Sequence, residues 1–548
     1  MSSEHADVIV IGAGLAGIVC ALELLERGPR RVLLLDRDLP ARVGGLARES
    51  FGGLLLVDTP LQRRHGLRDS PELAWQDWLA FGGFEPASAE PGHPDHWPRR
   101  WAEHYVHDAL PRLYHWLRDQ GIRFLPLPLW AERGVGPGEP GAARGNSVPR
   151  WHVVWGTGEH LIRTLLERLN RHPHRDRLTL RFGHKVEALV STHGAVTGCR
   201  GVREGEGGGV PFEADASQVV IAAGGINGGD LSLARQHWHP DWGTAPATLL
   251  NGSHRFADGT LHRAAEAVGG QLTHLNRQWN YAAGIAHWHP RQPHHGLSLV
   301  PPKSALWLNA RGERVWPPLV SGFDTRELVT QVCAQPGGYS WLLMNRRIAL
   351  KELAISGAEF NPNLRQRRVL GVARDLLLGQ PWLLDQLLTH SRDVAVGRDL
   401  DELASKMNAV QGDAEVRAES LREAVARYDQ EVALGAASTD PQRLRIAQLR
   451  QWKGDRTRTC AAARILDTAA QPLIALRTHI ISRKSLGGLL TDLDSRVLGA
   501  DGRPLRGLYA IGEAAGFGGG GMHGLRGLEG SFLGGCICSA QRAARAMS

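Results

Sequence analysis

The chain has 548 residues, of which 42% are apolar and 22% are charged, a composition that excludes a disordered protein. Because a single hydrophobic core rarely serves more than about 300 residues, the length predicts two domains. The net charge of +8 is dispersed along the chain, whereas a nucleic-acid-binding protein gathers such charge on one face or helix, so we expect no nucleic-acid partner.

The cysteines and the N-terminal residues bear on the compartment. No two of the six cysteines form a C-x-x-C pair, so we expect no iron–sulfur, zinc or other metal site and a reducing compartment. The chain enters a strand within a few residues, without the charged and apolar regions of a secretory signal. The apolar run 8–25 contains three glycines and belongs to a nucleotide-binding pattern, which argues against a membrane span. We therefore expect a cytoplasmic protein.

The first predicted element is a dinucleotide-binding unit. A short apolar run, 7–11, is typical of a buried parallel strand, and it leads into GAGLAG at 12–17 and an Ala- and Leu-rich helix that ends near Gly28. A second strand, 31–35, ends on Asp36, about 20 residues after the glycines, where a ribose-binding acid is required. With all parts in register, the segment predicts dinucleotide binding and not a glycine-rich turn used only for packing.

Each glycine of this motif has its own task. Gly12 permits the tight turn, Gly14 lets backbone N–H groups approach a pyrophosphate, and Gly17 allows the helix to pack closely on the strand. The helix N-terminus presents its positive dipole to the phosphates. Arg37, which follows the acid, leaves two alternatives open: it admits the phosphate of NADP, or it is solvated.

Two later segments favour FAD over NAD. The buried strand 217–223 ends in a glycine pair, and 507–516 repeats the order strand, glycine, acid with Gly512 and Glu513. An acid at that place can bind ribityl or phosphate-linked hydroxyls. A glycine-rich turn follows, and then a helix from about Gly530, whose N-terminus would stabilise negative charge on a reduced flavin.

Four stretches of the chain resemble the flavoproteins of the fumarate reductase/succinate dehydrogenase and 3-ketosteroid dehydrogenase superfamily: DVIVIGAGLAG, VGGLARESFGGLLLVD, VVIAAGG and LYAIGEAAG. The chain is still more similar to a bacterial branch of FAD-binding dehydrogenases, through stretches such as GNSVPRWHVVWGTG, HIISRKSLGGLLTDLDSRVL and GGGGMHGLRGLEGSFLGG. The resemblance runs essentially end to end. It implies an α/β fold, with a Rossmann-like FAD-binding domain of the glutathione reductase type and an inserted α+β cap domain.

Carried over position by position, the resemblance implies FAD contacts at both chain ends and in the middle of the first domain. Together with Gly512 from the strand–glycine–acid order, the candidate residues are Gly12, Gly14, Gly17, Asp36, Gly44, Gly45, Ser50, Gly52, Gly53, Val186, Ala223, Gly224, Glu513, Ser531, Phe532 and Leu533. In succinate dehydrogenases a histidine a few residues before the second glycine pair carries the flavin covalently. The stretch 44–49 offers no histidine, so we expect noncovalent FAD.

The βαβ rhythm stops between about 271 and 473. Residues 276–316 are rich in Trp, His and Pro and predict strands and loops, whereas 324–434 has helical periodicity. Parts of this segment also resemble the cap domain of the fumarate reductases. We therefore predict an FAD-binding domain made of 1–275 and 469–548, with a substrate or cap domain at 276–468 inserted into it.

The resemblance also suggests catalytic candidates near the flavin. In fumarate reductases a substrate-binding histidine precedes a glycine pair by three residues; that place holds Lys484, in a segment that also contains His479. Lys484 could hold an anion or a carbonyl oxygen, or make only a phosphate or surface contact. Arg526 lies within one residue of an arginine that grips a substrate carboxylate in the relatives; alternatively it neutralises reduced flavin or pairs with Glu529. His523 fits a structural or a catalytic role.

Two further candidates lie in the inserted segment. Ketosteroid dehydrogenases use tyrosines to abstract a proton beside a carbonyl, and Tyr281 could do so, or be a buried structural tyrosine. The proton-donor arginine of fumarate reductases should lie shortly before 305–309, where this chain has Pro301 and, nearby, Lys303. That departure argues against fumarate reduction. Four tryptophans between 75 and 101 are expected in a core, or as an apolar wall for a bulky, flat substrate.

We expect an FAD-dependent oxidoreductase that forms or reduces a carbon–carbon double bond beside a carbonyl or carboxylate of a small organic substrate, with a steroid-like molecule as one option. Flavin would exchange hydride at one carbon, a Tyr, Lys or His would handle the proton at its neighbour, and Arg526 with Lys484 would anchor the oxygen. Two alternatives stay open: an FAD-dependent oxidase or monooxygenase acting on an amine or phenol, and a non-catalytic FAD-binding subunit. The electron acceptor and a homo-oligomeric state stay open as well.

Overall fold

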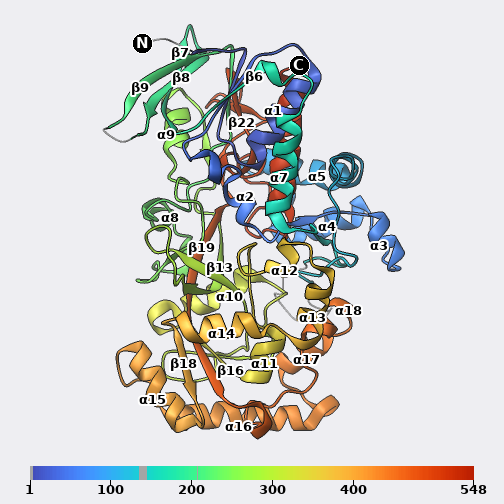
Figure 1. Ribbon diagram of the computed structural model, residues 1–548, viewed down its shortest axis with the longest axis vertical. Coiled ribbons are helices and arrows are strands. Elements are labelled where there is room, and N and C mark those ends of the chain that lie inside the picture. The colour runs from blue at the N-terminus through green and yellow to red at the C-terminus, as the bar shows by residue number, and fades with distance from the viewer. Residues whose placement is uncertain (1–3, 135–144, 206–207) are drawn as a thin grey trace. The chain divides into compact units, whose positions relative to one another are not determined.

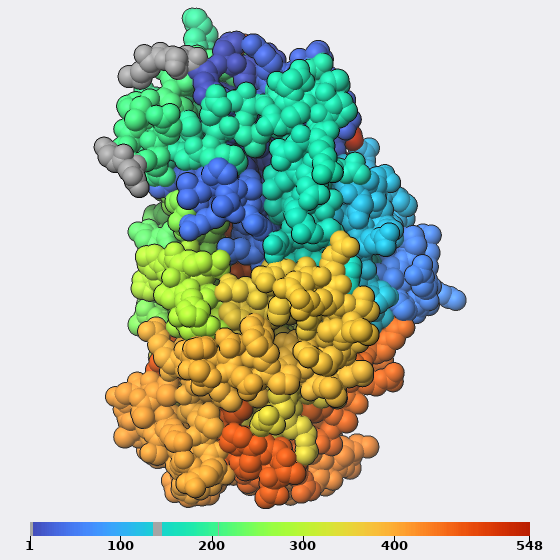
Figure 2. All heavy atoms as spheres, viewed as in Figure 1, coloured from blue at the N-terminus to red at the C-terminus, as the bar shows by residue number. Residues whose placement is uncertain are grey.

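The computed structural model describes residues 4–134, 145–205 and 208–548 (Figures 1 and 2). Contacts within the chain divide it into two compact units. The first unit comprises Met1–His237, Ser253–Trp279 and Lys484–Ser548, and the second comprises Trp238–Gly252 and Asn280–Arg483. The predicted inserted segment 276–468 falls in the second unit from residue 280 onward; as a domain assignment it stays a prediction.

The first unit is built on a sheet of ten strands, counted over the described residues. Its central strands run parallel, so that Val220 pairs with Val10 on one side and with Tyr509 on the other. In sheet order the path is β1 (Glu4–His5), β9 (Val210–Asp215), β8 (Ala195–Arg203), β22 (Pro504–Ala510), β10 (Gln218–Ile221), β2 (Val8–Ile11), β3 (Val32–Leu35) and β6 (Leu178–Arg181), with β7 (His184–Thr192) on β8 and β21 (Arg496–Leu498) on β22.

Helices of the first unit cover the parallel strands (Figure 1). Strands β2 and β3 are buried along their whole length, which is why they read as continuous apolar runs instead of alternating ones. Helices α1 and α19 pack against each other. The helices are α1 (Leu15–Arg27), α2 (Gly45–Glu49), α3 (Pro60–Arg64), α4 (Pro71–Gly82), α5 (His96–Asp108), α6 (His115–Asp119), α7 (Thr157–Asn170), α8 (Ser232–Gln236), α9 (Thr260–Ala267) and α19 (Ser531–Ala546).

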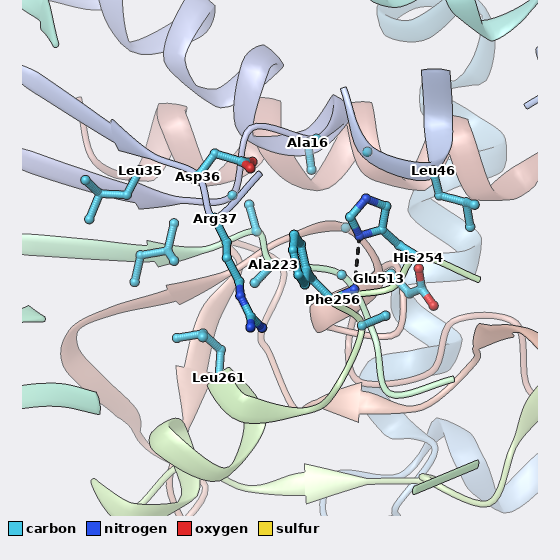
Figure 3. Close-up of a pocket in the computed structure, with 18 of the residues that line it drawn as sticks. Ala16, Leu35, Asp36, Arg37, Leu46, Ala223, His254, Phe256, Leu261 and Glu513 are labelled. Atoms are coloured by element: carbon cyan, nitrogen blue, oxygen red, sulfur yellow. Dashed lines mark hydrogen bonds between the residues drawn. The ribbon is translucent and has the colours of Figure 1, made fainter. Parts of the chain in front are cut away.

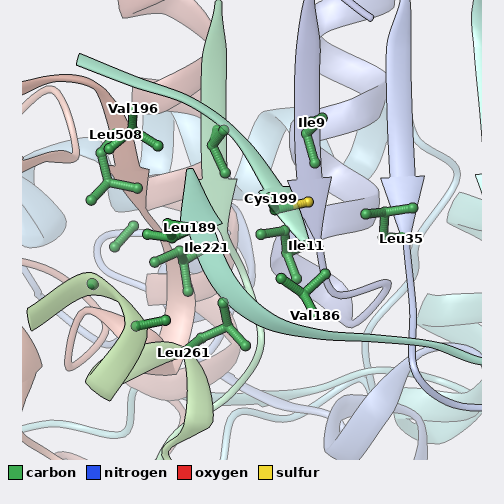
Figure 4. Close-up of a cluster of buried hydrophobic side chains, with 14 of the residues drawn as sticks. Ile9, Ile11, Leu35, Val186, Leu189, Val196, Cys199, Ile221, Leu261 and Leu508 are labelled. Carbon is green, nitrogen blue, oxygen red and sulfur yellow. The ribbon is translucent and has the colours of Figure 1, made fainter. Parts of the chain in front are cut away.

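Figure 4 shows a buried cluster where side chains from β2, β3, β7, β8, β10 and β22 meet those of α9. Ile9 and Ile11 of β2 contribute from the centre, Ile221 from β10, and Leu508 from β22. Leu261 of α9 closes the cluster. The cluster fixes the carboxyl ends of the central strands, and the loops that follow those ends form the site described below.

The second unit contains an eight-stranded sheet, counted over the described residues, whose neighbouring strands are mostly antiparallel. In sheet order its path is β15 (Leu306–Leu308), β16 (Tyr339–Asn345), β19 (Leu473–Ser485), β13 (Gln278–Ala286), β14 (Gly296–Val300) and β17 (Ala354–Ile355), with β11 (Leu250–Asn251) and β18 (Val394–Gly397) on β19. Its helices are α10 (Thr325–Cys333), α11 (Arg346–Glu352), α12 (Pro362–Arg365), α13 (Val369–Leu378), α14 (Pro381–His390), α15 (Leu400–Gln411), α16 (Ala418–Leu434), α17 (Pro441–Leu449) and α18 (Lys453–Arg458).

The longest helix of this unit shows why its sequence predicts a helix. The buried residues of α16 are Leu421, Ala424, Val425, Tyr428 and Val432, a spacing of three and four that places them on one face. Over residues 4–134, 145–205 and 208–548, no helix combines the length and the apolar character that crossing a bilayer requires.

Candidate functional site

The first unit has an open pocket with about 1020 Å³ of space not filled by protein atoms (Figure 3). Its lining includes the residues that directly follow β2, β3, β10 and β22, so it lies at the carboxyl ends of the parallel strands, where open α/β sheets bind their ligands. Nine of the predicted cofactor residues line it: Gly12, Gly14, Asp36, Gly45, Val186, Ala223, Gly224, Gly512 and Glu513.

The turn after β2 needs its glycines for space. Gly12 has a φ of +111°, and a Cβ there would lie 2.4 Å from the carbonyl oxygen of Ala222. A Cβ on Gly17 would lie 1.9 Å from the carbonyl oxygen of Gly12, so only glycine lets α1 pack this closely. A Cβ on Gly14, by contrast, would meet no described atom within 4 Å. The backbone at Gly14 is therefore open to the pocket.

Helix α1 begins at Leu15 behind this opening, and Gly14 at its N-cap provides no side-chain hydrogen bond. The first N–H groups of a helix need acceptors from outside the helix, and together with the helix dipole they favour an anion. The turn, the space above Gly14 and the start of α1 thus fit a pyrophosphate group.

Asp36 directly follows β3 and holds the glycine turn in place. Its carboxylate accepts hydrogen bonds from the backbone N–H of Ala13 at 2.6 Å and of Asp38 at 2.7 Å. Burial raises the pKa of the Asp36 carboxyl, while these two hydrogen bonds act in the opposite direction. The side chain lies at the pocket wall, where its oxygens can also accept hydroxyl groups of a ligand (Figure 3).

Arg37 makes contacts that neither sequence-based alternative describes. Its guanidinium group pairs with Glu204 at 2.9 Å and with Asp258 at 3.2 Å, and lies 4.2 Å from the centre of the Phe256 ring. Arg255 contacts the same ring at 4.4 Å. Arg37 therefore belongs to a charged and aromatic wall of the pocket. It is not simply solvated, and its charge is already paired with two carboxylates instead of being available to an NADP phosphate.

The segment His254–Leu261 supplies pocket residues that the sequence did not indicate. His254, Phe256, Ala257, Asp258, Thr260 and Leu261 line the pocket, and Phe256 donates its backbone N–H to Nδ1 of His254 at 3.3 Å (Figure 3). Burial lowers the pKa of His254. The stretch does contain an acid and a glycine, Asp258 and Gly259, directly before α9, but no buried strand leads directly into them to complete a strand–glycine–acid order. Lys185 and Cys536 are further lining residues of this kind.

The predicted cofactor glycines between residues 44 and 53 also allow close packing of the chain. Gly44 has a φ of +114°, and a Cβ there would lie 2.5 Å from Ile162 of α7. A Cβ on Gly52 would lie 2.7 Å from the nitrogen of Gly158, and one on Gly53 would overlap the Trp151 ring. Ser50 donates its hydroxyl to the carbonyl oxygen of Ala47 at 2.7 Å. The structure thus explains Gly44, Ser50, Gly52 and Gly53 by close packing, and their contact with FAD stays a prediction.

The C-terminal segment closes the pocket from the other side. Gly512 has a φ of +62°, and a Cβ there would lie 2.9 Å from the Cβ of Ala16, so the glycine lets this segment approach α1. Glu513 accepts the backbone N–H of Ser485 at 2.9 Å and lines the pocket. Ser531, Phe532 and Leu533, in the first turn of α19, do not line it; their predicted contact with FAD stays a prediction.

Lys484 and His523 meet at the start of α19. The Nζ of Lys484 lies 4.0 Å from the centre of the Phe532 ring, and the His523 ring lies 4.7 Å from the same ring. His523 is fully buried, and its Nε2 lies 2.8 Å from the hydroxyl of Ser531. Burial, with the nearby charge of Lys484, lowers the pKa of His523 to about 3. This environment favours the structural alternative for His523, as a neutral ring in an aromatic core.

Arg526 follows the glycine-rich turn and is half-buried in the same unit. Near it in sequence, Glu529 accepts the indole N–H of Trp279 at 3.4 Å, and Trp279 lies against Phe532 with 6.0 Å between the ring centres. Lys484, Glu529 and the rings of Trp279 and Phe532 therefore belong to one region around the first turn of α19, and Arg526 precedes that turn in the chain.

The remaining candidates, Tyr281, Lys303 and His479, belong to the second unit. Tyr281 is half-buried in β13, and the carbonyl oxygen of Lys303 accepts the side-chain N–H of Gln442 at 2.9 Å. His479 is buried in β19 with its Nε2 3.9 Å from Asp393. Burial acts to raise the pKa of Asp393, but hydrogen bonds from His479 and its other partners bring it below the ordinary value. His479 therefore has a buried carboxylate as its neighbour within the second unit, which fits a structural role.

The chain resembles known proteins along its whole length. Residues 7–533 match the FAD binding domain family. The chain is 43% identical to a KsdD-like steroid dehydrogenase of Mycobacterium tuberculosis, over 98% of this chain and 95% of the relative. It is also 43% identical to a KsdD-like steroid dehydrogenase of Mycolicibacterium smegmatis, over 96% of both.

Two solved structures have the same fold at low sequence identity. The 3-ketosteroid delta1-dehydrogenase from Sterolibacterium denitrificans matches with a TM-score of 0.67 and 16% identity, covering 100% of this chain and 99% of that one. A flavocytochrome c3 fumarate reductase in an open conformation matches with a TM-score of 0.65 and 19% identity, over 100% of this chain and 78% of that one. The predicted α/β fold class and the predicted superfamily are confirmed.

Proposed function

Because the chain belongs to the FAD binding domain family, within the superfamily of fumarate reductases and 3-ketosteroid dehydrogenases, we propose that it dehydrogenates a steroid-like ketone. As a member it is an FAD-dependent dehydrogenase that acts on CH–CH bonds. We propose the steroid-like substrate in addition to this family-level activity. It rests chiefly on 43% identity, over 98% of the chain, to a relative named as a steroid dehydrogenase.

The pocket of the first unit fits FAD. The open backbone at Gly14 and the start of α1 suit the pyrophosphate, and Asp36 and Glu513 offer carboxylate oxygens for hydroxyl groups. Val186 and Ala223 also line this pocket. When bound, FAD supplies the acceptor for a hydride leaving a carbon of the substrate.

The protein's own groups bind the ketone and move the proton. We assign Arg526 and Lys484 to the carbonyl oxygen, where positive charge stabilises the negative charge that develops when the neighbouring carbon loses a proton. Tyr281 is our candidate for taking that proton, with Lys303 as the second candidate. We assign no proton transfer to His523, because a buried imidazole with a pKa of about 3 is a weak base.

We further propose that FAD is bound noncovalently. The thiol and imidazole groups that line the pocket belong to Cys536, His254 and His184, so far as the described residues show. Burial raises the pKa of Cys536 to about 12, which leaves no thiolate at neutral pH to attack the flavin. Acid precipitation of the yellow protein should leave the flavin in the supernatant. A yellow pellet would contradict noncovalent binding.

The cytoplasm is the compartment we propose, since all six cysteines are free thiols and four of those six are buried. The electron acceptor is then a partner of the same compartment.

The test of the substrate uses the purified, FAD-loaded protein without oxygen. Addition of 4-androstene-3,17-dione or another 3-ketosteroid should bleach the flavin absorbance and yield a product two hydrogens lighter. Arg526→Ala should lower kcat/KM by about 100-fold, the typical effect of removing one charge-stabilising donor. Arg503→Ala, at an exposed arginine with 86% of its side chain accessible, is the matched control and should leave kcat/KM unchanged.

Three outcomes would contradict the proposal. Bleaching by no member of a panel of ketosteroids, enones and acyl acids would exclude this dehydrogenation. Steady release of hydrogen peroxide with an amine or phenol would identify an oxidase. Function unchanged by substitution of both Arg526 and Lys484 would indicate a subunit that only binds FAD.

A further inference from the structure

Helix α13 of the second unit is apolar, yet none of its residues is buried. Leu370 is 85% exposed, Leu377 76%, Leu378 72% and Val369 67%. A helix on the surface of a globular protein normally turns such side chains toward the core. In α13 the apolar side faces outward, which marks an interaction site more often than chance exposure.

The spacing within α13 makes this outer face continuous. Leu370, Ala373 and Leu377 follow one another at three and four residues, and Val369 and Leu376, two helical turns apart, lie beside them. The inner side is formed by the half-buried residues Gly371, Val372 and Asp375.

The inner side is held by polar contacts and close approach. Asp375 accepts the side-chain N–H of Asn363 at 2.7 Å. A Cβ on Gly371 would lie 2.5 Å from the side-chain oxygen of Asn363, so the helix sits directly on α12. Because this contact fixes which side faces in, the leucines on the other side cannot turn inward without breaking it.

Arginines lie beside the apolar face, and one of them, Arg374, is 3.5 Å from Asp375. A hollow with about 920 Å³ of free space, lined from α12, α13 and α14, includes Arg368 and Arg374 in its wall. Arg365 and Arg367 also precede the helix. The segment 361–390 thus contains four arginines but two acidic residues, Asp375 and Asp385. Trp382, at the start of α14, is 47% exposed and also lines the hollow. The segment 361–390 is part of the surface seen in Figure 2, in its gold region.

We propose that α13 and Trp382 form a docking surface for an anionic lipid bilayer. An apolar helix face with arginines at its rim and a tryptophan at its edge is the pattern of helices that lie in a membrane interface. The leucines would enter the boundary between headgroups and acyl chains, Trp382 would lie at the headgroup level, and Arg368 and Arg374 would contact lipid phosphates.

The charges favour a bilayer over a second copy of the chain. An isologous contact presents the same patch from both copies, so two patches with more arginines than acidic residues would be brought together. Lipid phosphates, in contrast, offer negative charge to the whole rim. The docking surface stands independently of the proposed substrate.

The test measures binding of the full-length, FAD-loaded protein to sedimenting vesicles, one set of phosphatidylcholine and one with about 30% phosphatidylglycerol. The protein should bind the anionic vesicles and release on addition of salt. The double variant Leu370→Asp/Leu377→Asp should bind at least about tenfold more weakly. Arg368→Ala/Arg374→Ala should lose about fivefold per arginine on anionic vesicles.

The matched control is Leu444→Asp/Leu466→Asp, which alters two leucines of the same unit that are 55% and 49% exposed. This control should bind vesicles like the unchanged protein, and all variants should keep their flavin absorbance and thermal midpoint. The proposal is overturned if the unchanged protein stays in the supernatant, or if the control loses binding as much as the α13 variant. It is also overturned if the protein is a dimer that Leu370→Asp/Leu377→Asp converts to monomers, because a second copy then covers the face.

Discussion

His523 is a residue whose charge is set by the protein interior and not by the solvent. It packs against Trp78, Phe517 and Phe532 and has its Nε2 at Ser531, and its pKa is about 3. In the unfolded chain a histidine titrates near 6.5. Between pH 6.5 and pH 3 the unfolded state therefore binds one more proton at this site than the folded state, and stability rises with pH in this range.

Replacing His523 by Gln should remove this dependence. Between pH 7 and pH 5 the free energy of unfolding of the unchanged protein should fall by about 2 kcal/mol more than that of His523→Gln, because only the former must exclude the proton. Urea unfolding at the two pH values measures the difference. Equal pH dependence in both proteins would show that His523 is protonated in the folded state.

Single residues differ in how far the sequence predicts them. Asp36 and the motif glycines are predicted because their distances along the chain follow from one strand–helix–strand unit. Phe256 and Asp258 line the same pocket but enter it from a loop whose position depends on long-range packing. His523 is neutral because Trp78 and Phe532, which lie far apart in the chain, help to bury it. The sequence does not show this packing, so it could not decide between a structural and a catalytic role for His523.

At the scale of elements, the two ends of α1 differ in how much room they leave for a side chain. A Cβ on Gly17 would meet the backbone of Gly12, whereas a Cβ on Gly28 would meet no described atom within 4 Å. Gly28 has a φ of 176°, an extended conformation that any residue adopts. The same substitution at the two ends therefore separates crowding from helix propensity.

Gly17→Ala should destabilise the protein by about 1–3 kcal/mol and weaken FAD binding at least about tenfold, because α1 must move away from the turn. Gly28→Ala should change the free energy of unfolding by less than about 0.5 kcal/mol. Urea unfolding and titration of apoprotein with FAD give the two quantities. Tight FAD binding by Gly17→Ala would show that the turn does not hold the pyrophosphate.

The elements that sequence predicts best have a clear apolar pattern. Strands β2 and β3 are continuous apolar runs buried along their length, and α10, α15 and α16 have their buried residues at helical spacing. Strand β7 mixes buried and exposed positions along its nine residues, which leaves a weaker pattern. The exposed leucines of α13 have the composition of a core helix, so composition alone could not place them on the surface.

For the whole molecule, the division into two units predicts how FAD affects unfolding. All residues that line the pocket belong to the first unit, although they come from three separate stretches of the chain. A ligand stabilises the part of a protein that binds it, and two-state behaviour is not expected for a chain of two units.

FAD at about 100 times its Kd should stabilise the first unit by about 2.7 kcal/mol. Hydrogen exchange measured by mass spectrometry should show slower exchange in peptides of the first unit when FAD is added to apoprotein. Peptides from the second unit, such as those of α15 and α16, serve as the internal control and should exchange as before. An equal change in both units would show that they unfold as one.

The position of β22 also matters for how the protein is made. This strand lies between β8 and β10 in the sheet but comes from residues 504–510, and Gly512 and Glu513 of the pocket follow it. During synthesis on the ribosome, β8 and β10 therefore each keep an unpaired edge until residues 504–510 have been translated. The cofactor pocket is complete only after Glu513 and Cys536 have followed, and a chain ended before β22 by a premature stop codon exposes strand edges prone to aggregation.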